Sequence, residues 1–277
     1  MSQTPVNLPY WDGYLKLLDS SGKAYDLEVL HSHYGCWDNP DWSNRVPDDY
    51  GRAAERMCQL VCLAGQVADR QRLLDVGCGL GTVVASINGR FERMELLGQN
   101  IDARQLDVAR QGVLPRGTNR VGWLASDACR LPLADASFDV VLALECTMHF
   151  SSRAAFLREV RRVLRTGGRL ALCEHFSTSP RKGAFDVPRL SRIWGSFLEP
   201  IAVEQFAALA AAAGLRLVHD QDVTRHTVPT CPGVRKMLLR TMPWPTSAKA
   251  YGTVLLAEWL MRLKLLRYKI VAFEAVD

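Results

Sequence analysis

The feature that most constrains this chain is an apolar strand that runs directly into a glycine-rich loop. The segment LLDV at residues 73–76 is followed by glycine at every second position, Gly77, Gly79 and Gly81. Glycine has no Cβ, so such a loop can turn tightly and bring its backbone close to a ligand. The dinucleotide-binding fingerprint would need a further glycine at position 82, which is Thr82 here. The loop alone is therefore weak evidence for a nucleotide-like ligand, and the segments after it decide the interpretation.

Apolar strands and amphipathic helices alternate along the middle of the chain, which predicts a parallel sheet with helices on both faces. Right-handed crossovers bring the carboxyl ends of parallel strands to one edge of the sheet, where ligands bind. Polar residues follow several of those ends, and we expect Asn100, Asp127, Glu145 and Glu174 to share one site. The expected strands lie near residues 72–76, 94–100, 121–125, 138–144 and 168–175, and the expected helices near 81–88, 103–111 and 152–164.

Four segments between residues 73 and 175 resemble, in order, the motifs of class I S-adenosylmethionine-dependent methyltransferases. They are the glycine-rich loop, LLGQNID at 96–102, the stretch from Asp127 through LPL at 131–133 to SFDVV at 137–141, and RVLRTGGRL at 162–170. In the last motif the usual proline is Thr166. The resemblance implies an α/β fold with a Rossmann-like seven-stranded methyltransferase sheet, helices on both faces and an antiparallel last strand. It also implies S-adenosyl-L-methionine as the cofactor.

Two further segments resemble a small-molecule subgroup of that family. HYGCW at 33–37 is similar to an HxGYW segment, and ECTMHF at 145–150 is similar to an ExxxHF segment after the fourth strand. The subgroup contains sugar and polyketide O-methyltransferases, sterol and tocopherol C-methyltransferases and small-amine N-methyltransferases. The likeness covers residues 30–175 well and the last hundred residues poorly.

The 277 residues fit a single domain in four parts. We expect an N-terminal helical arm or cap at 1–70, which includes a helix from Asp48 to about Ala68. The cofactor-binding core follows at 71–228. A helical lid insertion, largely helical from residue 247 on, occupies 229–265, and a closing strand of the core occupies 266–277.

The resemblance places cofactor-binding roles on named residues. Asp75 would hold the ammonium of the cofactor, the backbone of Gly77 and Gly79 would approach it, and the carbonyl of Leu144 would assist. Asn100, helped by Gln105, would bind the ribose hydroxyls, since an amide both accepts and donates hydrogen bonds. Asp127 and the adjacent Ala128 would lie at the adenine, and Tyr34 and Trp37 would fold over the methionine end.

Purely structural roles would also explain several of these residues. Asp127 would serve equally as a helix cap or turn residue. Asn100 would serve as a strand-end turn residue. Tyr34 and Trp37 would serve in core packing of the N-terminal arm.

Methyl transfer to a hydroxyl gains from a base that removes the hydroxyl proton. His149 is the leading candidate because imidazole titrates near neutral pH. Glu174 could orient that imidazole or act as the base, and Glu145 is a third carboxylate nearby. As alternatives, His149 caps the next helix and Glu174 pairs structurally with an arginine. We predict no metal site, because no Asp/His set has the spacing of a metal-dependent catechol enzyme.

Three functions compete on this sequence. The first is O-methylation of a hydroxyl on an apolar specialised metabolite, such as a polyketide or a glycosylated natural product. The second is C-methylation of an alkene, such as a prenyl or sterol-like substrate, with Glu145 stabilising a carbocation. Clustered cations for a diphosphate would then be Arg181, Lys182, Arg189 and Arg192. The third is a protein that binds the cofactor without transferring methyl, such as a cyclase.

The composition and charge limit the kinds of binding partner that we expect for this protein. A net charge of +5 does not require a nucleic acid, and the arginines of 158–165 have the spacing of a solvated helix face. The apolar stretches are too interrupted by charges for a membrane span. The eight cysteines form no Cys-x-x-Cys pair and suggest reduced, buried thiols of a cytoplasmic protein. We expect an apolar small-molecule acceptor, and a homodimer is left open.

Overall fold

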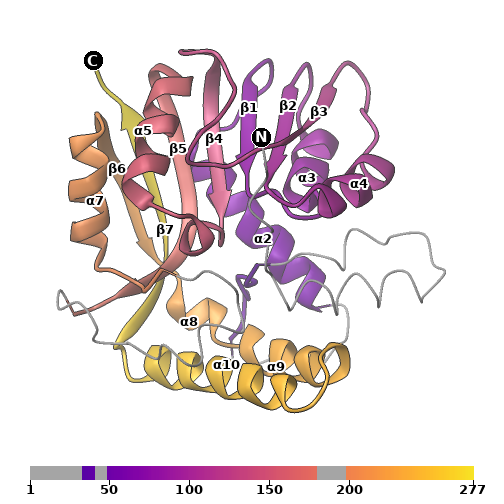
Figure 1. Cartoon of the computed structure of the whole chain (residues 1–277), viewed down its shortest axis with the longest axis vertical. Helices are drawn as coiled ribbons and strands as arrows, with labels where there is room; N and C mark the ends of the chain where they lie inside the picture. The colour runs from indigo at the N-terminus through magenta and orange to yellow at the C-terminus, as the bar shows by residue number, and fades with distance from the viewer. Residues whose placement is uncertain (1–32, 41–48, 180–197) are drawn as a thin grey trace.

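The computed structural model describes residues 33–40, 49–179 and 198–277, and every structural statement below concerns these ranges (Figure 1). One sheet of seven strands has the order β3-β2-β1-β4-β5-β7-β6. The first five strands are parallel, and β7 runs antiparallel to both of its neighbours. This confirms the expected α/β fold with an antiparallel last strand. The strands are β1 (Arg72–Val76), β2 (Glu95–Asn100), β3 (Arg120–Ala125), β4 (Phe138–Leu144), β5 (Leu164–Ser177), β6 (Leu215–Asp222) and β7 (Leu266–Ala275).

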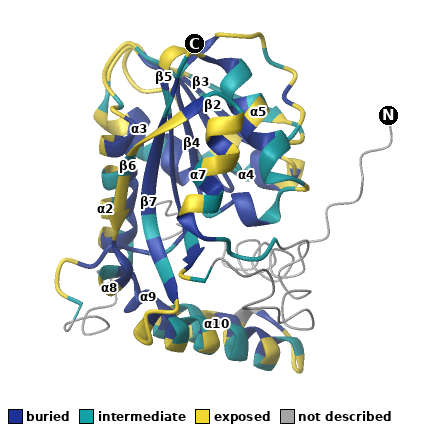
Figure 2. Ribbon diagram, turned by 90° about the vertical axis from the view of Figure 1, so that its left-hand side faces the viewer, coloured by how far each residue is buried: buried dark blue, intermediate teal, exposed yellow. Residues whose placement is uncertain are grey.

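Helices cover both faces of the sheet because successive strand residues point to opposite sides. On one face, Leu73 and Leu142 pack with helix α2 (Asp49–Ala64) and helix α3 (Thr82–Arg90). On the other face, Leu74 and Val141 pack with α5 (Arg153–Val163) and α7 (Val203–Ala212). Helix α4 (Ala103–Gly112) contacts β2 and β3. Figure 2 shows how the buried residues concentrate in the strands between these layers.

The insertion between β6 and β7 is a layer of three helices at the base of the molecule (Figure 1). They are α8 (Thr224–Thr227), α9 (Thr230–Thr241) and α10 (Thr246–Arg262), so helix begins well before the expected residue 247. Pro232 is tolerated because it lies in the first turn of α9, where backbone N–H groups have no helical partner to lose. Leu265 accepts a hydrogen bond of 3.2 Å from Thr178 N, so this layer adjoins the carboxyl end of β5.

Two other expectations need correction. The helix expected from Asp48 to about Ala68 ends at Ala64, because Gly65 follows and Gln66 adopts a left-handed φ of 52°. The arginines of α5 are not simply a solvated face, because Arg162 binds the carbonyls of Leu131 and Leu133. Residues 1–32 of the expected N-terminal arm, and the cations Arg181, Lys182, Arg189 and Arg192, lie outside the described residues.

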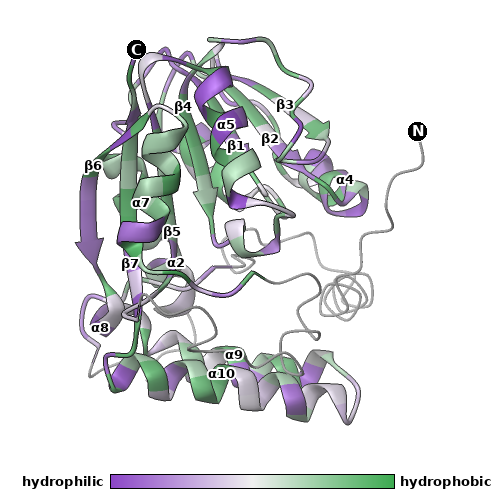
Figure 3. Cartoon of the chain, turned by 60° about the vertical axis from the view of Figure 1, so that its left-hand side comes forward, coloured by the Kyte–Doolittle hydropathy of each residue, from purple (hydrophilic) through white to green (hydrophobic). Residues whose placement is uncertain are grey.

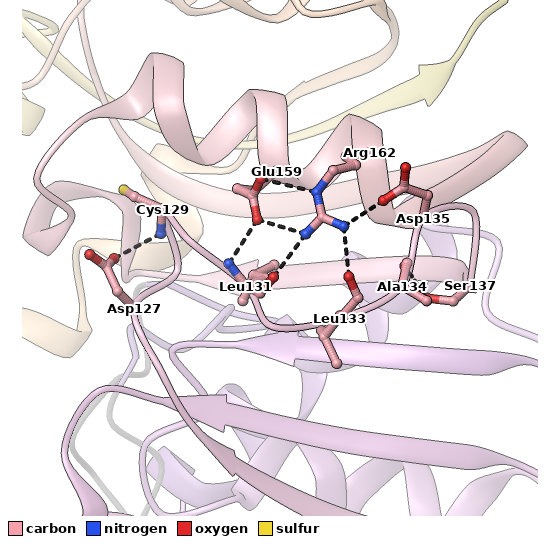
Figure 4. A network of polar contacts seen from close by, with 9 residues as sticks. All are labelled: Asp127, Cys129, Leu131, Leu133, Ala134, Asp135, Ser137, Glu159 and Arg162. Atoms are coloured by element: carbon pink, nitrogen blue, oxygen red, sulfur yellow. Dashed lines mark hydrogen bonds and ion pairs between the residues drawn. The ribbon is translucent and has the colours of Figure 1, made fainter. Parts of the chain in front are cut away.

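Figure 4 shows how Arg162 fastens the loop between β3 and β4 to α5. Besides the two carbonyls, its guanidinium forms ion pairs with Asp135 at 2.7 Å and Glu159 at 2.8 Å. Glu159 in turn accepts a hydrogen bond of 2.7 Å from Leu131 N. The loop that carries Asp127 is therefore held to α5 by two side chains of that helix, Arg162 and Glu159.

Candidate functional site

Asp75 is a buried carboxylate with an unsatisfied oxygen. It lies in β1, is 1% exposed, and its Oδ2 has no hydrogen-bond partner among the described residues. Burial raises the pKa of Asp75 to about 8. A buried polar atom without a partner costs free energy that a bound cationic group can recover. An unsatisfied buried carboxylate suits a cationic group such as an ammonium, and the role of Asp75 at the cofactor remains a prediction.

The loop after β1 needs its glycines. Gly77, Gly79 and Gly81 have φ values of 66°, 55° and 80°, the left-handed region that favours glycine. A Cβ on Gly81 would lie 2.5 Å from the Trp123 ring, and one on Gly77 would lie 2.5 Å from Cys146 Cβ. The glycine at 77 thus lets the loop pack against the residue that follows Glu145. The two segments that carry the cofactor and base candidates touch directly here.

Side-chain amides organise the end of β2. Asn100 donates to Gln105 Oε1 at 3.0 Å and accepts from Asp102 N at 3.1 Å. Gln99, which the sequence reasoning missed, accepts from Gly77 N at 3.3 Å and donates to the Ser126 carbonyl at 2.5 Å. Gln99 is 1% exposed, so its amide links the ends of three strands inside the protein. A glutamine inside an apolar strand was the available signal for this role.

Asp127 occupies an exposed turn, and its Oδ1 accepts a hydrogen bond of 2.8 Å from Cys129 N (Figure 4). This is the side-chain-to-backbone contact of an aspartate turn, which the sequence analysis gave as the alternative to adenine binding. The neighbouring Ala128 is buried. A role for this pair at the adenine remains a prediction.

The segment 33–37 connects the sheet edge to the helices inserted between β6 and β7. Trp37 donates from Nε1 to Thr230 Oγ1 at 2.9 Å, and its backbone N donates to the His226 carbonyl at 2.8 Å. Trp37 is only 7% exposed, so its indole packs into the structure. At the other end of the segment, Tyr34 N donates to Glu145 Oε1 at 2.6 Å. The structure thus brings Tyr34 to the candidate carboxylates and holds Trp37 against α8 and α9.

Glu145 lies at the centre of a polar cluster just past β4. Besides Tyr34 N, it accepts a hydrogen bond from the hydroxyl of Tyr268, which also lies 3.2 Å from Cys173 Sγ. Burial raises the pKa of Glu145 to about 8, although the bonds from Tyr268 and Tyr34 oppose this rise. The backbone of Glu145 has a φ of 48°, an uncommon value for a residue with a Cβ. Left-handed non-glycine residues of this kind occur at functional sites.

His149 ends the short 3-10 turn η1 (Thr147–His149) that follows Glu145 and Cys146, and its side chain is partly exposed. Glu174, which is 2% exposed, accepts from Thr147 Oγ1 at 2.9 Å and from His175 N at 3.1 Å. Burial raises the pKa of Glu174, and the Thr147 hydroxyl and Arg153 partly offset that rise. Glu174 therefore supports the start of the turn that carries His149.

His175 is a site residue that the sequence reasoning treated as ordinary. Its ring meets Tyr34 edge-on at 5.1 Å and Tyr268 at 4.9 Å between centroids. Its Nε2 is buried without a hydrogen-bond partner among the described residues, and burial lowers the pKa of His175 to about 4. The imidazole is therefore neutral at physiological pH. Only the pairing of β5 with β7, in which His175 lies opposite Tyr268, reveals this placement.

Across residues 33–40, 49–179 and 198–277, no group of three or more His, Cys, Asp or Glu side chains is arranged to hold a metal ion. No helix in the same ranges is long and apolar enough to cross a membrane. Seven of the eight cysteines are buried, and all eight are free thiols.

A glycine loop, a buried unsatisfied carboxylate and a strand order with an antiparallel last strand together define a Rossmann-like cofactor-binding enzyme. Residues 74–172 match the model of the methyltransferase domain family. The chain is 35% identical to the methyltransferase GfsG of Streptomyces halstedii over 208 residues, which cover 73% of this chain and 72% of that protein. This chain therefore belongs to the methyltransferase family, and S-adenosylmethionine is its cofactor.

Two other similarities bear on the function. The chain is 32% identical to the 27-O-demethylrifamycin SV methyltransferase of Amycolatopsis mediterranei (strain S699) over 220 residues, which cover 76% of this chain and 78% of that protein. The crystal structure of the (4+2)-cyclase SpnF matches with a TM-score of 0.74 and covers 99% of both chains. At 24% identity, the likeness to SpnF shows the fold alone.

Proposed function

We propose that this protein methylates a hydroxyl group of an apolar specialised metabolite, with His149 as the general base. The observation that carries this proposal is the η1 turn: Cys146, which precedes the turn, packs against the cofactor loop at Gly77, and His149 ends the turn three residues later. The name of the rifamycin relative, which specifies an O-demethylated substrate, supports oxygen as the acceptor atom.

The cofactor, when bound, supplies a methyl group on a positively charged sulfur. Asp75 would hold its ammonium, because the Oδ2 atom is buried and unsatisfied. Asn100 and Gln105 would bind the ribose hydroxyls as one hydrogen-bonded unit. The loop backbone at Gly77 and Gly79 would lie alongside. The proposed cofactor-binding set also includes Asp127 with Ala128, the carbonyl of Leu144, and Tyr34.

The protein's own residues would remove one proton from the acceptor hydroxyl and exclude water from the site. His149 would take the proton of the acceptor hydroxyl as the oxygen attacks the methyl carbon. Glu174 would act as a positioning residue, because it holds η1 through Thr147. We propose that residues 229–265 form a lid over the acceptor and that residues 1–70 form a cap. Methyl transfer benefits from such exclusion of water.

The proposal is tested by supplying methyl-labelled S-adenosylmethionine with a fractionated extract of the native host and following the label by mass spectrometry. With the acceptor in hand, His149→Ala should lower turnover about a hundredfold or more and leave cofactor affinity nearly unchanged. His219→Ala on β6 is the matched control, and its turnover should stay within about twofold of the original. Unchanged turnover of His149→Ala would remove His149 from the mechanism.

C-methylation is the second candidate, and the surroundings of Glu145 favour it. The rings of Tyr34 and Tyr268 are 5.6 Å apart beside this carboxylate, and aromatic faces stabilise cations. Glu145 would then stabilise a carbocation or take its proton. Fragmentation of the labelled product separates oxygen from carbon methylation. If the cofactor binds and no labelled product forms, the non-methylating alternative gains.

A further inference from the structure

The insertion from α8 to the start of β7, called the lid here and spanning residues 224–265, carries essentially all of the net positive charge of this protein. Residues 224–265 contain seven lysines and arginines and one acidic residue, whereas the whole chain has a net charge of +5. The rest of the chain is therefore close to neutral. This concentration is spread over more than forty positions, so no short run of charge reveals it. The cations are Arg225, Arg235, Lys236, Arg240, Lys249, Arg262 and Lys264.

The single acid of the lid does not neutralise this charge at the surface. Glu258 is 9% exposed and forms ion pairs with Arg235 and, at 2.8 Å, with Arg262. Within the described ranges, Lys236, Arg240 and Lys249 form no ion pair, and all three are exposed. Their charges are therefore available to an anionic partner.

Helix α10 is apolar on two opposite sides. One side packs inward through Ala250 and Val254. The opposite side exposes Leu256 by 36%, Trp259 by 57% and Leu263 by 60%. These three residues are spaced by three and four positions and form one stripe on the helix. Figure 3 shows α10 at the base of the molecule with hydrophobic residues along its length, and Figure 2 shows its exposed positions.

We propose that this outer face of the lid docks on an anionic lipid surface, with Trp259 and the two leucines in the interfacial layer and the lysines and arginines at the head groups. Helices with exposed Trp and Leu flanked by Lys and Arg bind membrane surfaces in this way. A second copy of the chain is disfavoured as the occupant, because two such basic faces would repel each other. The partner must therefore supply negative charge together with an apolar layer.

The first test is sedimentation of the full-length protein with vesicles, without any acceptor. We expect binding to vesicles that contain phosphatidylglycerol and about tenfold or greater loss of binding on pure phosphatidylcholine. Raising the salt from about 50 to about 500 mM should weaken the binding, because the screening length falls. Equal recovery with both kinds of vesicle, or with neither, overturns the proposal. The test does not depend on methyl transfer, so it is independent of the proposed function.

Variants separate the apolar contribution from the charge. Trp259→Ser with Leu263→Ser, and separately Lys236→Glu with Arg240→Glu, should each weaken vesicle binding about tenfold or more. Leu114→Ser and Arg158→Glu, exposed residues away from the lid, are the matched controls and should bind as the original does. Unchanged cofactor affinity in every variant would show that the fold is intact.

Three results would overturn the lipid assignment. Normal vesicle binding by the Trp259 and Leu263 double variant would show that the stripe does not enter the membrane. Binding of polyglutamate as tightly as vesicles, regardless of Trp259, would indicate an acidic protein as the partner. A dimer in sedimentation velocity that disappears in the same double variant would indicate a second copy.

Discussion

At the residue scale, Asp75 is the buried carboxyl whose protonation we expect to change when the proposed contact with the cofactor forms. Its pKa is raised by burial to about 8, so at pH 7 the empty protein carries a proton there. An ammonium beside Oδ2 would favour the charged form and lower this pKa. We therefore expect cofactor binding at pH 7 to release about one proton. Calorimetry in buffers of different ionisation enthalpy measures that release.

The control for this prediction is Asp75→Asn, which keeps the shape of the side chain. This variant should release no proton and should bind the cofactor about tenfold or more weakly, because hydrogen bonds to charged groups are the stronger ones. The same release from the variant would assign the proton to another group.

Tyr268 and Glu145 form the second testable pair at this scale. Tyr268→Phe removes the hydroxyl that donates to Glu145 and leaves that buried carboxyl with Tyr34 N. The free energy of unfolding should fall by about 1–3 kcal/mol. A double-mutant cycle with Glu145→Ala, which removes the accepting oxygens, is read by urea denaturation and measures the coupling between the two side chains. Additive effects would contradict a direct bond.

The residues that could be predicted at this scale are those carried by local motifs. Asp75 and the three glycines occur together in one short loop. His175 and Tyr268 could not be found that way, because they meet only when β7 pairs with β5. The sequence predicts Glu174 as a partner for His149. The structure shows that Glu174 accepts a hydrogen bond from Thr147 at the start of η1, and no spacing in the sequence indicates this contact.

At the scale of elements, the side chain of Arg162 connects α5 to the loop before β4. Arg162→Met should lower the free energy of unfolding by about 2–3 kcal/mol, because it leaves Glu159 and the Leu131 and Leu133 carbonyls short of a partner. Arg158→Met, an exposed position on the same helix, should stay within about 0.5 kcal/mol of the original. Urea denaturation of the two variants measures the difference, and equal stabilities would show that the network contributes little.

The elements also show where sequence patterns stop being informative. Alternating strands and helices predicted β1 to β4 closely, because each of these strands contains a short apolar run, whereas β5 begins at Leu164, before the expected residue 168. The insertion between β6 and β7 was harder to place, because α9 contains Pro232 and Gly233 near its start and Pro245 precedes α10, and such residues normally signal loops. The net positive charge of this insertion is also hard to see in the sequence, because the cations are distributed over three helices.

At the scale of the whole molecule, the buried ionisable groups predict how stability depends on pH. Asp75 and Glu145 have pKa values of about 8 in the folded protein, against ordinary values of 3.8 and 4.5. The folded state therefore binds more protons than the unfolded state up to about pH 8, and these groups make stability fall as pH rises. His175 has a lowered pKa of about 4, so it makes stability rise up to about pH 6.5 and has no effect above that.

Of these three groups, only Asp75 and Glu145 change the free energy of unfolding between pH 6.5 and 8. The melting temperature of the cofactor-free protein should therefore fall over this interval. Asp75→Asn should make that fall smaller, and saturating cofactor should do the same. Thermal denaturation followed by circular dichroism over this range is the measurement. A melting temperature that rises over the interval would mean that these carboxyls are not buried in solution.

The antiparallel pairing of β6 with β7 has an evolutionary consequence. Asp222 and Lys269 lie opposite each other across this pair, so the lid is an excursion from a hairpin whose two ends are already fixed. The entropic cost of closing such an excursion grows slowly, by about 0.6 kcal/mol for each doubling of its length. New acceptor specificities could then arise by exchanging this cassette while the cofactor half stays unchanged. Any transplanted cassette would have to preserve its docking on the segment 33–37, where Trp37 forms hydrogen bonds with Thr230 and His226.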